Sequence, residues 1–465
     1  MSNQDVVASP TSPADGLTRA RSFRAIAAAT AGTFIEWYEY GLYTYVAGLV
    51  IAPLFFPEGA GSVAVLATFA TFAVGFAARP VGGIVLGAAG DRWGRRPVLI
   101  FSIILMGVAT TSIGLLPPFA AIGIWAPALL VLFRLMQGFG AGAELASAMI
   151  YVNESTQQKA KGYHSSFLLV GSMMGAILSL VLFTGLSAAL TSEAFLEWGW
   201  RVPFLLGAVL TVIGLLLRRK VGESPEFERV QRERDAGRAP MARRNPLAAM
   251  GDAFKASPRN FIAGFLLPSG LNVTGFVAQA FGISYLSGQI GLSADETLLT
   301  IFVMMGVGVL VLPLWGRLTD KLGAKLVLYA GAIGGIILAF PYFMALQTGN
   351  LPLIVVASVL IWAVGWAAGN AAQLIILPAI FRTEYRSSGL TSSRELQGAL
   401  VAGPTPLIAT ALVLALGGAP WLVAAMIVLA QTMTIVGMLI ARPTLTAEEV
   451  ESASAHRGLG VKSSA

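Results

Sequence analysis

Apolar stretches long enough to cross a lipid bilayer recur along almost the whole of this 465-residue chain. A helix needs roughly 20 apolar residues to cross the hydrocarbon core. Backbone polar groups find no water there, so only helices and closed barrels span it. The apolar runs are continuous, without the alternation of barrel strands, and only 12% of the residues are charged. The sequence therefore predicts an all-α integral membrane protein.

Twelve membrane spans are expected, six on each side of a long polar segment. The spans of the first half are expected near residues 25–52, 63–89, 97–117, 122–148, 165–190 and 201–218. Those of the second half are expected near residues 261–289, 298–316, 325–346, 351–379, 391–417 and 419–441. The chain then divides into an N-terminal tail, a six-helix half, a central linker, a second six-helix half and a C-terminal tail, at residues 1–24, 25–218, 219–260, 261–441 and 442–465. The linker is expected to be solvated, and helical along Pro225–Arg234.

Basic residues occupy alternate loops between these spans. The loops after the second, fourth, eighth and tenth spans contain Arg92, Arg95, Arg96, Lys159, Lys161, Arg317, Lys321, Arg382 and Arg386. The loops after the first, third, seventh, ninth and eleventh spans contain no Lys or Arg. Because basic loops mark the cytoplasmic side, the span count is even and both termini are expected to be cytoplasmic. Topology thus accounts for the net charge of +7, which gives no reason to expect a nucleic-acid partner.

A ten-residue pattern occurs twice, in the second cytoplasmic connection of each half. Both copies read G-x-x-x-D-(R/K)-x-G-x-(R/K), and their residues are Gly87, Asp91, Arg92, Gly94 and Arg95 in the first copy and Gly316, Asp320, Lys321 and Gly323 in the second. The glycines are expected to allow a tight turn between packed helices. The aspartate is expected to cap a helix N-terminus or pair with a basic side chain. Two copies in register indicate a duplicated fold with a gate in each half.

This pattern resembles the signature loop of the major facilitator superfamily. Further motifs resemble its metabolite:proton symporters, which carry organic acids, proline and betaine: Glu36-Trp-Tyr-Glu39-Tyr40-Gly-Leu-Tyr43, Arg79-Pro-Val-Gly-Gly83, Arg134-Leu-Met-Gln137-Gly138 and Trp200-Arg-Val-Pro-Phe204. The chain departs from that family at Glu39, where an Asp is usual, and at Ala143, where a Gly is usual. The resemblance implies a monomeric multi-pass protein of the cell (inner) membrane, with the proton as coupling ion and no other cofactor.

Ionisable residues are expected at mid-membrane depth in three spans of the first half. Glu36 lies twelve residues beyond Arg24, which is roughly 18 Å along a helix. Arg79 precedes Asp91 by the same interval, and Arg134 falls near the middle of the fourth span. Buried charges are costly in a membrane and usually functional. Their helical spacing places Glu36, Glu39, Tyr40 and Tyr43 on one face, and Arg134 and Gln137 on another.

These faces predict a central cavity with a carboxylate–guanidinium switch. A carboxylate beside an arginine keeps its charge, whereas one that is separated and desolvated takes up a proton. The resemblance implies that Glu39 and Arg134 form this pair, with Glu36 in reserve. Arg79 is then expected to be free to bind the substrate, since its planar fork suits a carboxylate. The competing interpretation is a static buried ion pair that only fixes helix packing.

The second half contributes mainly neutral polar residues to the expected cavity. Candidates for its other wall are Asn272, Gln279, Trp366, Asn370 and Gln373. Arg394 and Glu395 are expected at the cytoplasmic start of the eleventh span, as a gate or a helix-end salt bridge.

The residues favour transport over other functions. No nucleophile–base pair or nucleotide-binding loop occurs, and two histidines without any cysteine make a metal centre unexpected. The duplicated gates favour alternating access over a channel. Two central arginines favour import of a small carboxylate-bearing metabolite by proton symport. Uptake of zwitterionic solutes such as proline or betaine, drug or metabolite efflux, and a transporter-like sensor remain alternatives.

Overall fold

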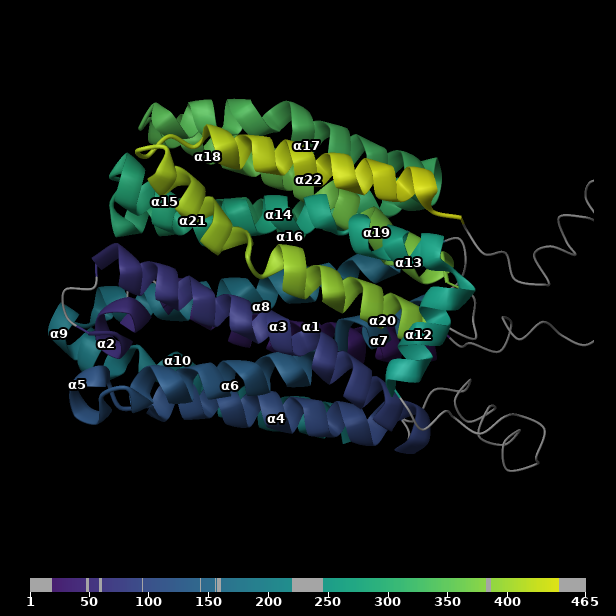
Figure 1. Ribbon diagram of the computed structural model, residues 1–465, viewed down its shortest axis with the longest axis horizontal. Helices are drawn as coiled ribbons and strands as arrows, with labels where there is room; N and C mark the ends of the chain where they lie inside the picture. The colour runs from purple at the N-terminus through teal and green to yellow at the C-terminus, as the bar shows by residue number, and fades with distance from the viewer. Residues whose placement is uncertain are drawn as a thin grey trace, which may run out of the picture.

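The computed structural model describes residues 19–46, 50–57, 61–93, 95–142, 144–154, 156, 160–219, 246–381 and 386–442, and these residues are almost entirely helical. The helices run roughly along the long axis of the molecule in two bundles, one from each half of the chain (Figure 1). The short helices α2 (Ala52–Phe55), α5 (Phe119–Ile122) and α9 (Ser192–Ala194) lie together at one end of the long axis. The predicted all-α class is confirmed.

Each expected span coincides with helix in the described residues. Those of the first half are α1 (Arg19–Val46), α3 (Gly61–Trp93), α4 (Arg95–Leu115), α6 (Trp125–Ala141) with α7 (Glu144–Glu154), α8 (Lys161–Ala189) and α10 (Arg201–Arg219). Those of the second half are α13 (Pro258–Leu266) with α14 (Ser269–Phe276) and α15 (Gly282–Tyr285), α16 (Ala294–Leu322), α17 (Ala324–Gln347), α18 (Leu351–Leu360) with α19 (Ala367–Ala379), α20 (Arg386–Gln397) with α21 (Thr405–Ala415), and α22 (Trp421–Ile440).

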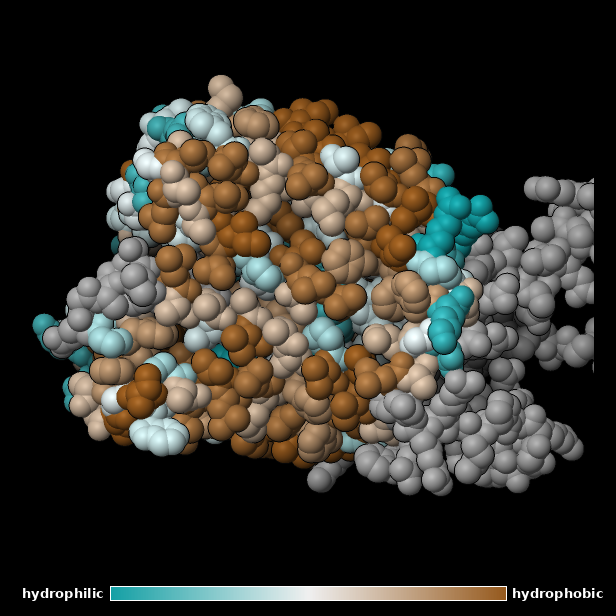
Figure 2. All heavy atoms as spheres, in the orientation of Figure 1, coloured by the Kyte–Doolittle hydropathy of each residue, from teal (hydrophilic) through white to brown (hydrophobic). Residues whose placement is uncertain are grey.

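Ten helical stretches among the described residues are long and apolar enough to cross a membrane. Hydrophobic side chains cover the middle of the face shown in Figure 2, and hydrophilic side chains gather toward the ends of the molecule. This distribution suits a bilayer around the middle of the bundle. The count of twelve spans and the cytoplasmic placement of both termini stay predictions.

The two halves meet along two pairs of helices. Helix α8 packs against α1 within its own half and against α16 of the other half. Helix α3 packs against α6 within its half, and against α20 and the π-helical segment η9 (Gly398–Ala402) of the other half. The side chains between these pairs are therefore the ones that a relative movement of the halves would rearrange.

Helix is also found within the segment expected as the central linker. Residues 246–256 form a helix, α12 (Pro246–Ala256), which packs against α20 and α3, and α13 begins at Pro258. The end of the expected linker is thus part of the packed structure. The helix expected along Pro225–Arg234 lies outside the described residues.

Wide π-helical turns interrupt three spans of the second half. They are η5 (Val277–Phe281) and η6 (Leu286–Ile290) in the seventh span, η7 (Ile361–Trp366) in the tenth and η9 in the eleventh. A π-turn inserts an extra residue into the helical register and is common at functional sites. Faces predicted from a regular helical period therefore shift at these turns.

Candidate functional site

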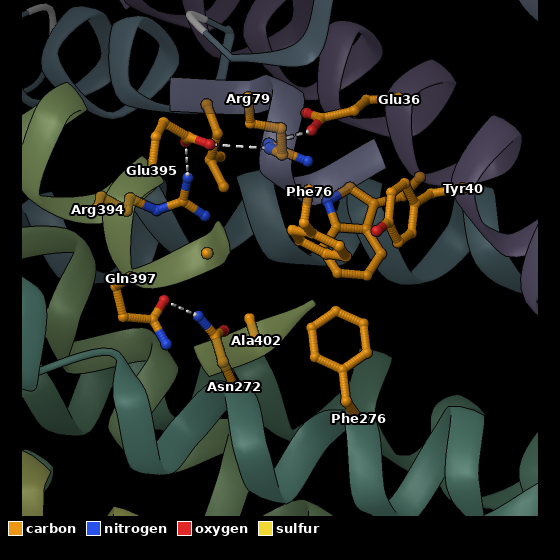
Figure 3. Close-up of a pocket in the computed structure, with 13 residues that line it drawn as sticks. Glu36, Tyr40, Phe76, Arg79, Asn272, Phe276, Arg394, Glu395, Gln397 and Ala402 are labelled. Carbon is orange, nitrogen blue, oxygen red and sulfur yellow. Dashed lines mark hydrogen bonds and ion pairs between the residues drawn. The ribbon is translucent and has the colours of Figure 1, made fainter. Parts of the chain in front are cut away.

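Three buried charges and one partly buried arginine, Arg394, form a chain of ion pairs from both halves beside a central cavity (Figure 3). A terminal nitrogen of Arg79, in α3, donates to Oε1 of Glu36 in α1 at 2.8 Å. The Arg79 Nε donates to Oε2 of Glu395 in α20 at 2.9 Å. Glu395 Oε1 accepts from Arg394 at 2.8 Å. Two acids and two arginines thus alternate, which balances the charge of the network.

Aromatic and amide side chains complete the wall of this cavity. The rings of Trp37, Tyr40, Phe76 and Phe276 line it, together with Asn272 and Gln397. Phe76 and Phe276 belong to different halves and meet edge to face, with ring centroids 5.4 Å apart. Asn272 Nδ2 donates to Gln397 Oε1 at 2.7 Å. The cavity therefore offers cations, carboxylates, amides and ring faces within one small space.

A second small cavity lies on the first-half side, and Glu39 and Arg134 both line it with Gln137. It shares Glu36 and Tyr40 with the first cavity. Arg134 is almost completely buried and donates to Gln137 Oε1 at 2.9 Å. Its guanidinium also lies over the Tyr43 ring, 4.1 Å from the centroid, which is a favourable position for a cation.

Glu39 is not paired with Arg134 in the described structure. Glu39 is 2% exposed, and neither carboxyl oxygen has a hydrogen-bond partner among the described residues. Leaving a buried charge without a partner is costly, so the neutral acid fits this environment better than the carboxylate. This arrangement differs from the expected ion pair. The role of the two residues stays a prediction.

The expectation that Arg79 stands free is wrong for this conformation. It forms ion pairs with two carboxylates, Glu36 and Glu395, and its guanidinium also lies over the Phe76 ring. Arg79 does line the cavity, as predicted for a substrate-binding residue. The difference arises from Glu395, which was expected at the cytoplasmic end of its span but lies beside Arg79.

The expected wall residues of the second half divide into two groups. Asn272 lines the Arg79 cavity. Gln279 lies elsewhere in the contact between the halves, where its Nε2 donates to the Tyr45 hydroxyl at 3.2 Å. The other three are buried but do not line the Arg79 cavity, namely Trp366, Asn370 and Gln373.

The last three residues instead pack among themselves within the tenth span. Trp366 stacks on Trp362, with ring centroids 4.3 Å apart. Asn370 Nδ2 donates to the Trp366 carbonyl at 2.9 Å, and Gln373 donates to Asn370. The three residues therefore share a face, as their spacing predicted, but this face does not line the Arg79 cavity.

Sequence reasoning missed the eleventh span as the main wall of the second half. That span supplies Arg394, Glu395, Gln397, Gly398 and Ala402 to the cavity. The signal available was the Arg394-Glu395 pair itself, since adjacent opposite charges at a predicted span are costly unless they line a polar space.

The second copy of the repeated pattern joins the two halves. Both carboxyl oxygens of Asp320, in α16, accept hydrogen bonds from the backbone N–H groups of Gly162 and Tyr163, at 2.7 and 2.8 Å. These groups lie at the N-terminus of α8, where the unpaired amides and the helix dipole favour an anion. The predicted helix-capping role of the aspartate is thus confirmed for this copy, and the capped helix belongs to the other half.

The repeated segments were expected to form tight turns, but most of their described residues lie in the ends of helices. Gly316, Asp320 and Lys321 lie within α16, and only Gly323 forms the turn to α17, with a positive φ of 89° that favours glycine. In the first copy the backbone of Gly87, Asp91 and Arg92 lies within α3, and Arg95 begins α4. Gly94, and the side chains of the other residues of this copy, lie outside the described part of the chain.

We expect Asp320→Ala to loosen the contact between α16 and α8. Hydrogen bonds to a charged group contribute about 1.5–3 kcal/mol each, so their loss should favour separation of the helices at least about tenfold. The chain has no cysteine, and Ser166 is fully buried in α8 beside Gly316. A cysteine placed at Ser166 should therefore react about tenfold faster with a maleimide in the Asp320→Ala background.

The matched control for this experiment is Lys321→Ala, which changes an exposed residue of the same helix. It should leave the labelling rate unchanged. Equal labelling of the Asp320→Ala and control proteins would show that the contact does not hold α8 and α16 together.

Comparison with known proteins agrees with this fold. The sequence profile described as Major Facilitator Superfamily matches residues 30–402. The chain is 35% identical over 404 residues to the shikimate transporter of Escherichia coli, covering 87% of this chain and 91% of that protein. It is also 35% identical over 390 residues to the proline/betaine transporter of Salmonella typhimurium, covering 84% of this chain and 77% of that protein.

Among solved structures, the xylose transporter of Escherichia coli in a partially occluded inward-open conformation has a similar fold. Its TM-score is 0.68 at 17% identity, over 90% of this chain and 96% of that chain. The apolar spans and the bacterial transporters it resembles identify a multi-pass protein of the cell (inner) membrane. The profile match and the curated relatives together show that the chain belongs to the major facilitator superfamily, as a transporter and not an enzyme.

Proposed function

We propose that this protein is a secondary active transporter that imports a small carboxylate-bearing metabolite by proton symport through alternating access. The observation that carries the proposal is a buried arginine, Arg79, at a cavity between the two halves. An arginine fork binds carboxylates with two parallel hydrogen bonds. The names of the relatives support the proposal, since shikimate, proline and betaine each bear one carboxylate.

In this proposal the proton is carried by a carboxyl group of the first half. Glu39 is the first candidate because it is buried without a hydrogen-bond partner among the described residues. Arg134 lines the same small cavity and would pair with it in another conformation, and Glu36 is the reserve candidate. The protein is proposed to act as a monomer, because the path lies between the two halves of one chain.

Uptake of a zwitterion such as proline or a betaine is the second candidate function. The rings of Trp37, Tyr40, Phe76 and Phe276 lie in the same cavity as Glu36. Ring faces and a carboxylate suit the cationic end of a zwitterion, while Arg79 suits its carboxylate end.

Uptake into proteoliposomes tests the proposal. Shikimate, benzoate, proline and glycine betaine would be supplied to vesicles with an acidic outside, with and without an uncoupler. We expect accumulation of at least one of them above its outside concentration, and loss of that accumulation with the uncoupler. Uptake of none would contradict the proposal in favour of a sensor or an exporter, and uptake that ignores the uncoupler would exclude proton coupling.

A further inference from the structure

We propose that Glu395 is a tethered competitor, which occupies the place of the substrate carboxylate on Arg79 while the cavity is empty. This inference rests on the proposed function, because it takes Arg79 as the group that binds the substrate carboxylate. The inference adds a role for a residue of the second half, Glu395, which the substrate displaces when it binds. The proposal follows from the arrangement of the four charges in Figure 3.

Glu395 makes the kind of contact that a substrate carboxylate would make, but a weaker version of it. Only Oε2 of Glu395 reaches Arg79, at 2.9 Å, because Oε1 is held by Arg394 at 2.8 Å. A free carboxylate could direct both oxygens to the guanidinium, and the bidentate arrangement is the stronger one. A small carboxylate in the cavity can therefore replace Glu395 on Arg79 with a net gain in hydrogen bonding.

The second partner of Glu395 makes its displacement possible. A buried ion pair that loses one partner leaves a costly unpaired charge. Glu395 keeps Arg394 when it leaves Arg79, so its charge stays compensated. The other carboxylate on Arg79 has no such alternative: Oε2 of Glu36 has no hydrogen-bond partner among the described residues. The substrate is thus expected to displace Glu395 and leave Glu36 in place.

Displacement also removes a contact between the halves. Arg79 and Glu36 belong to the first half, whereas Glu395 and Arg394 belong to the second. When a substrate carboxylate binds Arg79, the Arg79–Glu395 ion pair between the halves is therefore lost. It is replaced by an ion pair between Arg79 and the substrate, which does not join the halves. Binding and the relative movement of the halves are coupled through this exchange.

The test compares variants on either side of Glu395. Glu395→Gln removes the competitor, so the half-saturation concentration for uptake of shikimate and of glycine betaine should fall about tenfold, the size of one charge-assisted hydrogen bond. The maximal rate should fall with it, because release slows. Arg394→Gln removes the alternative partner, so Glu395 holds Arg79 more firmly and the half-saturation concentration should rise about tenfold. The double variant should behave like Glu395→Gln.

Opposite shifts distinguish competition from a structural ion pair. Both substitutions break the same Glu395–Arg394 contact, so a purely structural role would change the half-saturation concentration in the same direction, which would overturn the proposal. The methyl ester of shikimate lacks the anion and should bind the variants and the parent protein equally. If Glu395→Gln does not fold, Glu395→Asp, whose shorter arm cannot span both arginines, should shift affinity in the same direction.

The outcome also separates this inference from the proposed function. Parent protein that accumulates neither shikimate nor glycine betaine contradicts the proposed function for these probes and this inference with it. Parent protein that accumulates one of them, with half-saturation unchanged in Glu395→Gln and Arg394→Gln, contradicts only the role given to Glu395.

Discussion

Replacing Arg79 by glutamine should abolish the uptake of carboxylate-bearing solutes, with a fall in initial rate of about a hundredfold or more. The substitution removes the proposed anchor for the substrate. It also leaves Glu36 and Glu395 facing a cavity without the cation that lies between them, and like charges in a buried site repel one another. Initial rates in proteoliposomes at matched protein density would measure the effect.

Arg79→Lys is the control that separates charge from geometry. Lysine keeps the positive charge but lacks the planar fork, so uptake should recover in part and with weaker affinity. Full uptake by Arg79→Gln would show that the substrate carboxylate binds elsewhere, and Arg134 would be the next residue to replace.

Glu39→Gln should abolish accumulation driven by a pH gradient while leaving the exchange of solute across the membrane. Glutamine resembles the protonated acid in size and polarity, and Glu39 lies in a site that favours the neutral form because it offers no partner among the described residues. The variant can then still occlude and move solute, but it cannot release a proton. Counterflow of labelled solute and uphill uptake would be measured on the same vesicles.

Glu36→Gln is the informative comparison for Glu39→Gln. Glu36 forms an ion pair with Arg79 at 2.8 Å. Because Arg79 is the proposed substrate-binding residue, replacing Glu36 should change substrate affinity more than it changes proton coupling. If uphill uptake survives in Glu39→Gln but not in Glu36→Gln, the residue that carries the proton is Glu36 and not Glu39.

Much of the architecture was predictable, because a bilayer leaves the backbone few choices. Long apolar stretches must be helices, and each expected span coincides with one. The burial of Glu36, Glu39 and Arg134 was predictable for the same reason, since charges at that depth must face the protein interior.

The second half of the site was not predictable, and the reason is geometric. The eleventh span was expected to begin at residue 391, but α20 begins at Arg386. Glu395 lies nine residues, or roughly 14 Å of helix, beyond that start, and it lines the cavity. The π-turns add a second source of error, because they depend on tertiary packing and leave no periodic signal in the sequence.

The bonds of Asp320 to α8 have a consequence for how this contact would be recognised in other proteins. Its donors are main-chain amides, which every residue except proline supplies. Tyr163 could therefore be exchanged during evolution while the hydrogen bond stays intact. Paired changes at two positions, which usually reveal a spatial contact, would not be found for these hydrogen bonds, and one side-chain pair available to co-vary here is Arg317 over the Tyr163 ring. The hydrogen bonds themselves constrain position 320, and the close approach of the two backbones constrains Gly162 and Gly316, where an added Cβ would meet the carbonyl oxygen of the other glycine. The bonds of Asp320 would therefore be seen as single conserved positions and not as co-varying pairs.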